Sequence, residues 1–295
     1  MKKIPFVLAL ALASPINAGA AAPHADYIGS FELTGSDAYF GGFSGLEFSA
    51  DGTSFTTLSD KAALISGQVT RNAAGAIVAV DAAAPSRRLL DANGQPLIDP
   101  ENDSEGLAEA PDGTFYVSFE RAHRVAHYRA DGHLIDTLPI PDFFAEMESN
   151  SGMEGLAIAP DGTLYTQPEG NVAGMRSDPV FRYRGGVWDR PFRIAEDGTW
   201  RPTGSDFGPD GRLYILERDF WPFLGFRSRL RRISFDGRGV TADDVLFETH
   251  AGRHGNLEGL SIWQDGAGAI HATMISDNNF LRILRCQFVD YVVRD

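Results

Sequence analysis

The chain has 295 residues, of which 43% are hydrophobic and 11% aromatic, so it carries enough apolar material for one large buried core. Its formal net charge of −14 at pH 7 argues against DNA, RNA or an anionic membrane as a partner, because each would be repelled. The single cysteine, Cys286, excludes an internal disulfide, and its alternating apolar neighbours predict an ordinary strand residue.

The first 20 residues have the pattern of a secretory signal. Lys2 and Lys3 precede the apolar stretch Ile4–Ala13, and small residues ending at Ala20 offer a cleavage site. This stretch is too short to span a bilayer comfortably, and no other segment is long enough. We therefore expect cleavage near Ala20, a single domain over residues 21–295, and a location in the periplasm or the surrounding medium.

One short phrase returns five times along the rest of the chain. Its copies are Ser44-Gly45-Leu46, Glu105-Gly106-Leu107, Glu154-Gly155-Leu156, Thr203-Gly204 and Glu258-Gly259-Leu260. In every copy the glycine precedes the glycine of an Asp-Gly turn by seven residues. Alternating β-rich runs flank these turns and a second hairpin often follows, so each repeat predicts a four-stranded antiparallel sheet. Sheets repeated at a period of roughly 50 residues are typical of a β-propeller.

The number of repeats predicts an all-β propeller of five blades. The last repeat lacks a fourth strand, and residues 27–33 are the segment that can supply it by pairing with the C-terminal strand. That pairing would close the ring through the two ends of the chain. Six blades would require a further, degenerate blade within residues 62–100.

Acidic residues recur at two positions of the repeat. The first strand of each blade begins with Ser44, Glu105, Glu154, Thr203 or Glu258, and the second ends near Asp60, Glu120, Glu169, Glu217 or Asp277. The geometry of the turn predicts that Glu105 faces Glu120. In the next repeat it predicts that Glu154 faces Glu169. Like charges placed opposite one another are destabilising, so we expect a counter-charge between them.

The repeated acids form a candidate metal site, because the first strands of a propeller line its axis and place these side chains on one rim of the channel. Hard oxygen ligands suit Ca²⁺ better than Mg²⁺ or Mn²⁺, and no Cys/His cluster suggests zinc. The candidate ligands, including the acids three residues after the two hydroxyl positions, are Glu47, Asp60, Glu105, Glu154, Asp206, Glu258 and Asp277. The alternative is that the acids cap turns or pair with neighbouring arginines. No organic cofactor is expected.

The joint order of several motifs resembles the phytase-like family of exported bacterial proteins, known for an esterase-like activity of phytase. The motifs are Phe43-Ser44-Gly45-Leu46, Asp60-Lys61, Asp103-Ser104-Glu105-Gly106-Leu107, Phe119-Glu120-Arg121, Glu154-Gly155, Asn256-Leu257-Glu258-Gly259-Leu260 and Asp277-Asn278-Asn279. They belong to a match over about residues 27–293. The resemblance implies a propeller fold, export, and hydrolysis of esters, phosphate esters included. It carries over no catalytic set residue by residue.

A carboxylate rim with bound Ca²⁺ can hydrolyse a phosphate ester without a covalent intermediate. Bound cations polarise the phosphate oxygens and lower the pKa of a bound water, while a free carboxylate takes the proton. The candidate catalytic residues are Glu105, Glu120, Glu154 and Glu169. The candidate substrate-binding bases are Lys61, Arg121, Arg124 and Arg218, because such groups bind phosphate oxygens and a planar guanidinium suits them best.

Two apolar segments can cover the mouth of the channel as a lid or pocket wall, plug the channel, or pack between blades. They are Asp142–Met147 and Asp219–Phe226, and the second leaves the expected rim directly after Arg218. An exposed loop of this kind at a site often contacts the substrate. The sequence favours none of these arrangements over the others.

The first hypothesis is a metal-dependent phosphoesterase, resembling phytases, that acts on a small-molecule ester. One alternative is a lactonase or carboxylesterase that uses a single Ca²⁺, and the other is a non-catalytic binding propeller that Ca²⁺ stabilises. A basic cluster at the acidic mouth would favour the first, and a buried metal beside an apolar pocket the second. Acids fully paired with arginines would favour the third. The sequence leaves the oligomeric state open, a monomer included.

Overall fold

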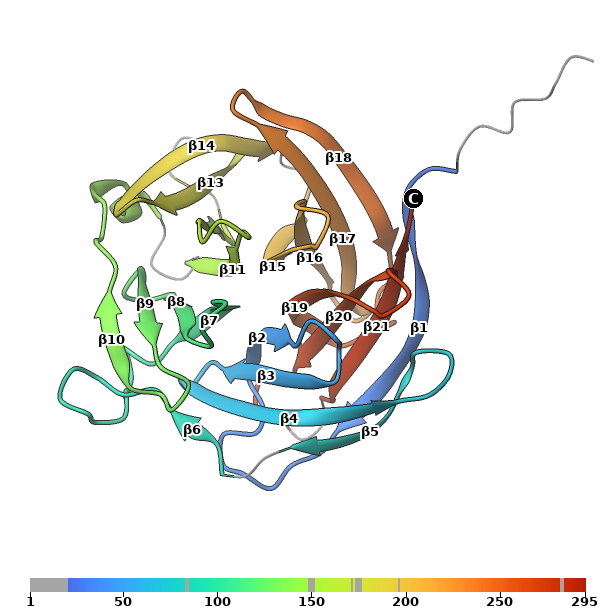
Figure 1. The fold of residues 1–295 in the computed structure, drawn as a ribbon, viewed down its shortest axis with the longest axis horizontal. Helices are drawn as coiled ribbons and strands as arrows, with labels where there is room; N and C mark the ends of the chain where they lie inside the picture. The colour runs from blue at the N-terminus through green and yellow to red at the C-terminus, as the bar shows by residue number, and fades with distance from the viewer. Residues whose placement is uncertain are drawn as a thin grey trace, which may run out of the picture.

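The structure is a computed structural model, which describes residues 21–82, 85–147, 152–170, 172, 177–195, 197–281 and 284–295. The expected leader, residues 1–20, lies outside them. Within the described residues, five antiparallel sheets stand around a central axis and form a five-bladed β-propeller (Figure 1). The described residues contain no helix that is both long and apolar enough to cross a membrane.

Each blade consists of antiparallel strands, and its first strand lies nearest the axis (Figure 1). The first blade holds β2 (Phe43–Phe48), β3 (Ser54–Ser59), β4 (Ala63–Arg71) and β5 (Ile77–Ala82), with the short β6 (Arg87–Arg88) paired to β4. The second holds β7 (Ser104–Glu109), β8 (Phe115–Phe119), β9 (Arg124–Tyr128) and β10 (Leu134–Thr137). The third holds β11 (Met153–Ile158), β12 (Leu164–Pro168), β13 (Ser177–Arg184) and β14 (Val187–Ala195). The fourth holds β15 (Arg201–Phe207), β16 (Leu213–Trp221), β17 (Gly225–Asp236) and β18 (Gly239–Glu248).

The fifth blade joins the two ends of the chain. It consists of β19 (Asn256–Gln264), β20 (Ile270–Asp277), β21 (Cys286–Arg294) and β1 (His24–Leu33). Strand β1 pairs with β21, and Leu33 stands opposite Cys286. The predicted closure by residues 27–33 is confirmed, and Cys286 is a buried strand residue as expected. The described part of residues 62–100 contains β4, β5 and β6 of the first blade, so the count is five rather than six.

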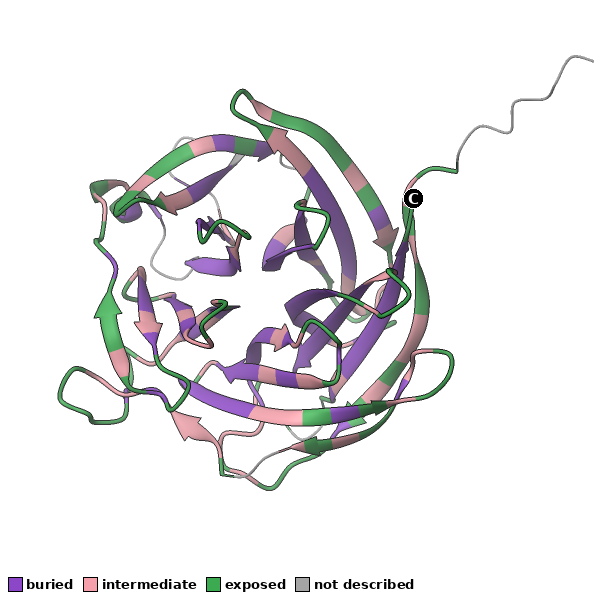
Figure 2. Cartoon of the chain, viewed as in Figure 1, coloured by how far each residue is buried: buried purple, intermediate pink, exposed green. Residues whose placement is uncertain are grey.

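The apolar core lies between neighbouring sheets. Leu58 and Leu64 of the first blade, for example, pack with Leu107 and Phe119 of the second in one buried cluster. Figure 2 shows buried residues concentrated in the strands near the axis and exposed residues on the outer strands and loops. Removal of these apolar faces from water is the main force that holds the blades together.

The repeated glycines allow the five innermost strands to pack directly against one another. A Cβ added at any of them would lie within 2.9 Å of the first strand of the next blade; the glycines are Gly45, Gly106, Gly155, Gly204 and Gly259. The approach is closest at Gly204, where the added carbon would lie 2.2 Å from the carbonyl oxygen of Glu258. The glycine of the sequence repeat is therefore a packing requirement of the ring.

Segment Asp142–Met147 fills a gap between the second and third blades. It contains the short 3-10 helix η1 (Asp142–Glu146), in which Phe144 is 2% exposed. The ring of Phe144 packs against Phe181 and Trp188 of the third blade, with centroids 5.4 and 5.2 Å away. Of the arrangements that the sequence left open for this segment, the structure has the packed one.

We expect Gly204→Ala to lower the free energy of unfolding by about 1–3 kcal/mol, because an extra methyl group must push two inner strands apart. Chemical denaturation followed by tryptophan fluorescence measures this change. Gly266→Ala is the matched control, since no atom lies within 4 Å of its added Cβ. Equal stability of the two variants would contradict the packing role of the repeated glycine.

Candidate functional site

A β-bulge near the start of each innermost strand frees one side chain toward the channel. In the third blade, Met153 pairs with Pro168 and Gly155 with Gln167, so Glu154 is an extra residue in the ladder. The same one-residue shift occurs in the other four blades, at Ser44, Glu105, Thr203 and Glu258. Bulges bend the strand and re-aim the side chain that they free. The five positions of the sequence repeat are thus the five bulges of the structure.

The bulges overturn two expected cross-strand pairs. Glu120 donates its backbone N–H to the carbonyl of Asp103 at 2.9 Å, so it does not stand opposite Glu105. Glu169 is displaced from Glu154 in the same way. The predicted register was wrong because it assumed a regular ladder without the extra residue. The carboxylates still come together, since the freed side chains turn toward the axis.

Two groups of three carboxylates lie at this end of the channel, and they share Glu120. In the first group, oxygens of Asp103, Glu105 and Glu120 lie within 4.8 Å of one another. In the second group, oxygens of Glu120, Glu154 and Glu169 do the same. We call these five residues the carboxylate rim. The rim joins the second blade to the third.

Gly152 explains how Glu120 reaches the neighbouring blade. A Cβ at position 152 would lie 2.6 Å from the Cα of Glu120, so any larger residue would push the two blades apart. The backbone N–H of Glu169 donates to the carbonyl of this same glycine at 3.0 Å. Gly152 therefore brings Glu120 and Glu169 to one place.

Burial and mutual repulsion raise the pKa of the central rim carboxyls. For Glu105, burial is the largest cause, followed by the charges of Glu154 and Glu258. For Glu154, burial is again the largest cause, Glu169 adds to it, and an arginine partly offsets both. Burial also raises the pKa of Glu120. Deprotonation of these carboxyls is therefore less favourable than that of ordinary surface carboxyls.

The fourth blade places a base at the rim where the neighbouring blade places an acid. In the ladder between β15 and β16, Arg218 stands opposite Arg201, the first residue of β15. Glu217 precedes Arg218 by one residue and stands opposite Pro202. Glu217 is buried and binds Arg229 and Arg231, the second at 2.9 Å. The alternative interpretation of Glu217, pairing with arginines, is confirmed.

Arg218 joins the rim to the fifth blade. Its Nη2 lies 2.6 Å from Oε1 of Glu169, and its Nη1 contacts Glu258 and donates to Oδ1 of Asn256 at 3.0 Å. Burial alone would lower the pKa of Arg218, but the charges of Glu258 and Glu169 raise it above its ordinary value. Burial raises the pKa of Glu258 to about 8, and Arg218 offsets only part of this effect. One guanidinium is shared by two carboxylates and neutralises neither completely.

Asp60 and Asp277 extend the acidic surface toward the first and fifth blades. Burial raises the pKa of Asp60 to about 7, and the charge of Asp277 adds to the effect. Oδ1 of Asp60 is buried and has no hydrogen-bond partner among the described residues. Burial also raises the pKa of Asp277, whose Oδ1 accepts the N–H of Asn279 at 2.6 Å. An orphaned carboxylate oxygen is a group that a bound ligand would satisfy.

Lys61 and Arg124 lie on aromatic rings at the margin of this surface. Nζ of Lys61 is 3.4 Å from the centroid of the Phe280 ring, and the guanidinium carbon of Arg124 is 3.8 Å from that of Phe119. Arg124 also donates to the carbonyl of Glu101 at 2.7 Å. Both cations thus have aromatic partners of their own.

Arg121 is half-exposed and binds two aspartates on the outer side of the rim. Its distances to Asp99 and Asp103 are both 2.8 Å. Arg121 and Arg218, two of the four candidate phosphate-binding bases, are therefore already paired with carboxylates. The mouth is acidic in sum, and its cations lie at its edges.

Glu47 and Asp206 lie at the opposite end of the channel, so the prediction that they join the rim is wrong. Each stands three residues beyond a bulge, which is about 10 Å along a strand that rises about 3.3 Å per residue. Asp206 accepts the N–H groups of Phe207 at 2.7 Å and Ile262 at 2.6 Å, and Glu47 accepts that of Glu109 at 3.1 Å. These acids line a separate cavity of about 420 Å³.

Two further residues of this site were not among the predicted ligands or catalysts. Asp103 and Asn256 each precede a bulged glutamate by two residues, and they contact Arg121 and Arg218 respectively. Polar residues at this position of the repeat were the signal that could have found them.

A cavity of about 450 Å³ opens beside Arg218. Its lining residues are Glu169, Thr199, Arg201, Arg218, Asp219, Phe220, Phe226, Asn256 and Asn279. Strands β16 and β17 extend past the rim as a hairpin, in which Phe220 pairs with Phe226. Phe220 and Trp221 remain 58% and 44% exposed. The segment Asp219–Phe226 is therefore an aromatic wall of a polar cavity, not a plug of the channel.

The geometry of the carboxylate rim fits a hard divalent cation. Two oxygens bound to one Ca²⁺ at about 2.3–2.6 Å lie at most about 5 Å apart, and the separations within 4.8 Å meet this limit. Both groups offer carboxylate oxygens alone, which is the donor type that Ca²⁺ prefers. A cation there would also cancel the repulsion that raises the pKa of Glu105 and Glu154.

Comparison with protein families gives one match. The profile of the phytase-like family, described as "esterase-like activity of phytase", matches residues 38–280. This range contains every residue of the carboxylate rim and Arg218. No curated protein sequence matches the chain.

Several solved structures are similar in fold. A luciferin-regenerating enzyme is 12% identical, with 92% of this chain and 95% of that one covered and a TM-score of 0.47. The PQQ-bound aldose sugar dehydrogenase of Streptomyces coelicolor is 16% identical, with coverages of 92% and 100% and a TM-score of 0.46. A gluconolactonase of Xanthomonas campestris is 15% identical, with coverages of 81% and 68% and a TM-score of 0.40. Nothing about the substrate of this chain follows from these likenesses.

The raised pKa values predict how the metal-free protein responds to pH. Glu258 and Asp60 bind protons with a pKa of about 8 and about 7 in the folded state, against ordinary values of 4.5 and 3.8. Folding therefore favours their protonated forms, and stability should fall as pH rises from about 5 to about 8. Thermal melts of metal-stripped protein across this range measure the slope.

The slope should become shallower in Glu258→Gln, which removes one titrating group. Glu32→Gln is the matched control, because the Glu32 side chain is 56% exposed and pairs with Arg285, which is not a residue of the carboxylate rim. It should leave the slope unchanged. A melting temperature that rises between pH 5 and pH 8 without metal would contradict the electrostatic description of the site.

Proposed function

The chain belongs to the phytase-like family, and we propose that it hydrolyses esters, phosphate esters first among them, at the carboxylate rim. The proposal includes a bound divalent cation, Ca²⁺ in the first place. The observation that carries it is the pair of carboxylate groups that share Glu120, with oxygens within 4.8 Å of one another. Such an arrangement is costly to fold unless a cation compensates it.

The proposed ligands are Asp103, Glu105, Glu154 and Glu169, all of which belong to the carboxylate rim. When bound there, Ca²⁺ would polarise an ester oxygen and acidify a water molecule. Arg218 holds Glu169 in place at 2.6 Å and adds positive charge beside the position of the substrate. Asn256 fixes Arg218 from the other side at 3.0 Å.

Glu120 is the proposed general base. It belongs to both carboxylate groups, and burial raises its pKa, which makes it a stronger base than an ordinary surface carboxylate. Asp103 holds the backbone of Glu120 through a hydrogen bond of 2.9 Å. The carboxylate would take the proton of the attacking water and later return it to the alcohol that leaves.

The cavity of about 450 Å³ beside Arg218 is the proposed place for the alcohol or acyl part of the substrate. It opens next to Glu169, and Phe220 and Phe226 form its aromatic wall. A carboxylic ester or lactone is the second candidate substrate. It is favoured by the pairing of Arg121 and Arg218 with carboxylates, which leaves these bases less positive charge for a phosphate group.

Calcium should stabilise the folded protein strongly if the rim binds it. At a hundredfold excess over its dissociation constant, a ligand of the folded state alone adds about 2.7 kcal/mol. We expect this shift in thermal melts of chelator-treated protein titrated with Ca²⁺, and a much smaller one in Glu105→Gln and Glu154→Gln. Glu47→Gln, at the opposite end of the channel, should keep the full shift. Loss of the shift in Glu47→Gln alone would show that the metal binds at the opposite end of the channel, beside Glu47.

Hydrolysis should depend on Glu120 more than on any base at the margin. We expect Glu120→Gln to lower kcat for 4-nitrophenyl phosphate, or for 4-nitrophenyl acetate, roughly 10²- to 10⁴-fold, as the loss of a general base does. Lys61→Met is the control at the margin and should change kcat little. A calcium-dependent melt with no hydrolysis of either ester would leave a binding propeller as the function. Full activity of Glu120→Gln would overturn the assignment of the base.

A further inference from the structure

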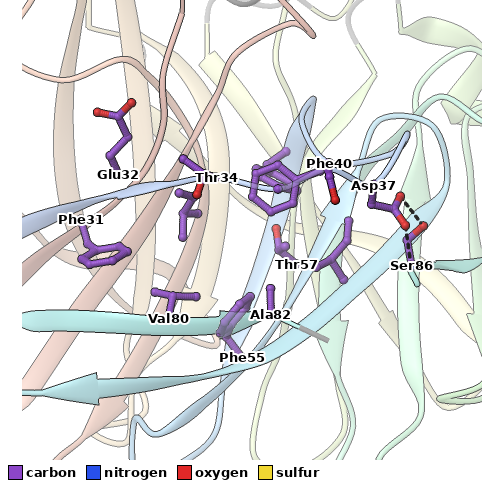
Figure 3. A pocket seen from close by; sticks show the side chains of 15 residues that line it. Phe31, Glu32, Thr34, Asp37, Phe40, Phe55, Thr57, Val80, Ala82 and Ser86 are labelled. Atoms are coloured by element: carbon purple, nitrogen blue, oxygen red, sulfur yellow. Dashed lines mark hydrogen bonds between the residues drawn. The ribbon is translucent and has the colours of Figure 1, made fainter. Parts of the chain in front are cut away.

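A second cavity lies away from the carboxylate rim, under the segment that joins β1 to β2. This segment, residues 34–42, runs over the gap between the fifth and first blades; we call it the strap. The cavity beneath it measures about 280 Å³. Figure 3 shows Phe31, Phe40, Phe55 and Val80 around this space. None of the rim carboxylates lines it.

Four of the residues that line the cavity are phenylalanines, from the strap and from three strands. Phe40 of the strap meets Phe43 edge to face, with centroids 5.2 Å apart at 83°. Phe43 and Phe55 are 0% and 5% exposed, so their positions are fixed by the core behind them. Phe31 of β1 packs against the same core cluster from the fifth blade. The wall therefore presents preformed ring edges and faces, which attract another aromatic ring.

The polar groups near the mouth of the cavity are occupied by one another. Asp37 accepts the backbone N–H and the hydroxyl of Ser86 at 3.0 and 2.8 Å (Figure 3). It also accepts the N–H of Tyr39 at 2.8 Å. Thr57 donates to the carbonyl of Gly45 at 2.7 Å. Few of these groups are left to hold water inside, so the interior is suited to an apolar guest.

The charges at the mouth select against anions. Among the described residues that line the cavity, Glu32 and Asp37 are the charged ones, and both are acids. Arg285 pairs with Glu32 at 3.6 Å, so the repulsion comes mainly from Asp37. Hydrogen bonds from the backbone of Ser86 and Tyr39 lower the pKa of Asp37, so it is ionised at neutral pH. A fatty acid or an aromatic carboxylate would meet repulsion there.

From these observations we propose that the cavity under the strap is a binding site for a small, uncharged aromatic molecule of about two fused rings. The size follows from the volume, since a dry cavity of about 150 Å³ holds one benzene and this one is nearly twice as large. The partly exposed rings of Phe31 and Phe40 supply attraction, and Asp37 at the mouth supplies selectivity. This site goes beyond the proposed hydrolysis and does not depend on it.

The test uses the full mature chain with indole and 2-naphthol as uncharged probes and 2-naphthoate as the anionic one. Isothermal titration calorimetry should give saturable binding of both uncharged probes at one site per chain. The carboxylate should bind at least tenfold more weakly. No saturable binding of either uncharged probe, or equal binding of the anion, would overturn the proposal.

Two filling variants locate the site. Val80→Phe adds a ring from β5 into the cavity, and Ala82→Leu adds a smaller group from the same strand, in case the first variant does not fold. Each should weaken binding at least tenfold while the thermal melt remains cooperative. Val78→Phe is the matched control, because Val78 is 51% exposed on the same strand and does not line the cavity. Binding that survives in a folded filling variant would place the probe elsewhere and refute the assignment.

Discussion

The site depends on one constraint: five bulged residues are forced toward a single axis. Where the bulged residue is a hydroxyl, it bridges to the next blade, as Ser44 does to the carbonyl of Ser104 at 2.7 Å and Thr203 to that of Leu257 at 3.0 Å. Where it is glutamate, the ionised side chain only accepts hydrogen bonds and so cannot donate to a carbonyl of the next blade. Three acids therefore face the same axis, and loss of contact with water raises their pKa. A positive counter-charge would stabilise this arrangement.

The arginines of the blades neutralise some of these acids and not others, and the acids without an arginine partner define the site. Arg218 lies between Glu169 and Glu258 and covers the side of the fourth and fifth blades. Arg121 covers the outer side of the second blade through Asp103. Between them, Glu105, Glu120 and Glu154 have no ion pair among the described residues. This uncompensated part, and not the acidic ring as a whole, is where a cation and a substrate would be bound.

The sequence was sufficient for the architecture because its signals are periodic. The glycine and the Asp-Gly turn repeat in every blade, and the N-terminal strand was the one segment left to complete the fifth. The same periodicity brought Glu105, Glu154 and Glu258 to one end. It gave the wrong partners for Glu105 and Glu154, because bulges shift the register and are invisible without the hydrogen-bond ladder. It also assigned to Glu217 the rim position that Arg218 holds. Glu47 and Asp206 lie three residues further along their strands, which places them at the other end of the channel. Contacts between blades, such as Arg218 with Glu169 across 49 residues, have no local signal.

The most direct test of the central claim is a crystal structure of the mature protein soaked in Ca²⁺ at pH 7.5, with anomalous diffraction collected at long wavelength. The account predicts an anomalous peak within coordination distance of the proposed ligands Glu105, Glu154 and Glu169. It also predicts that Arg218 keeps its contact with Glu169 in that crystal. A rim with no peak, or a peak confined to Glu47 and Asp206 at the other end of the channel, would contradict it.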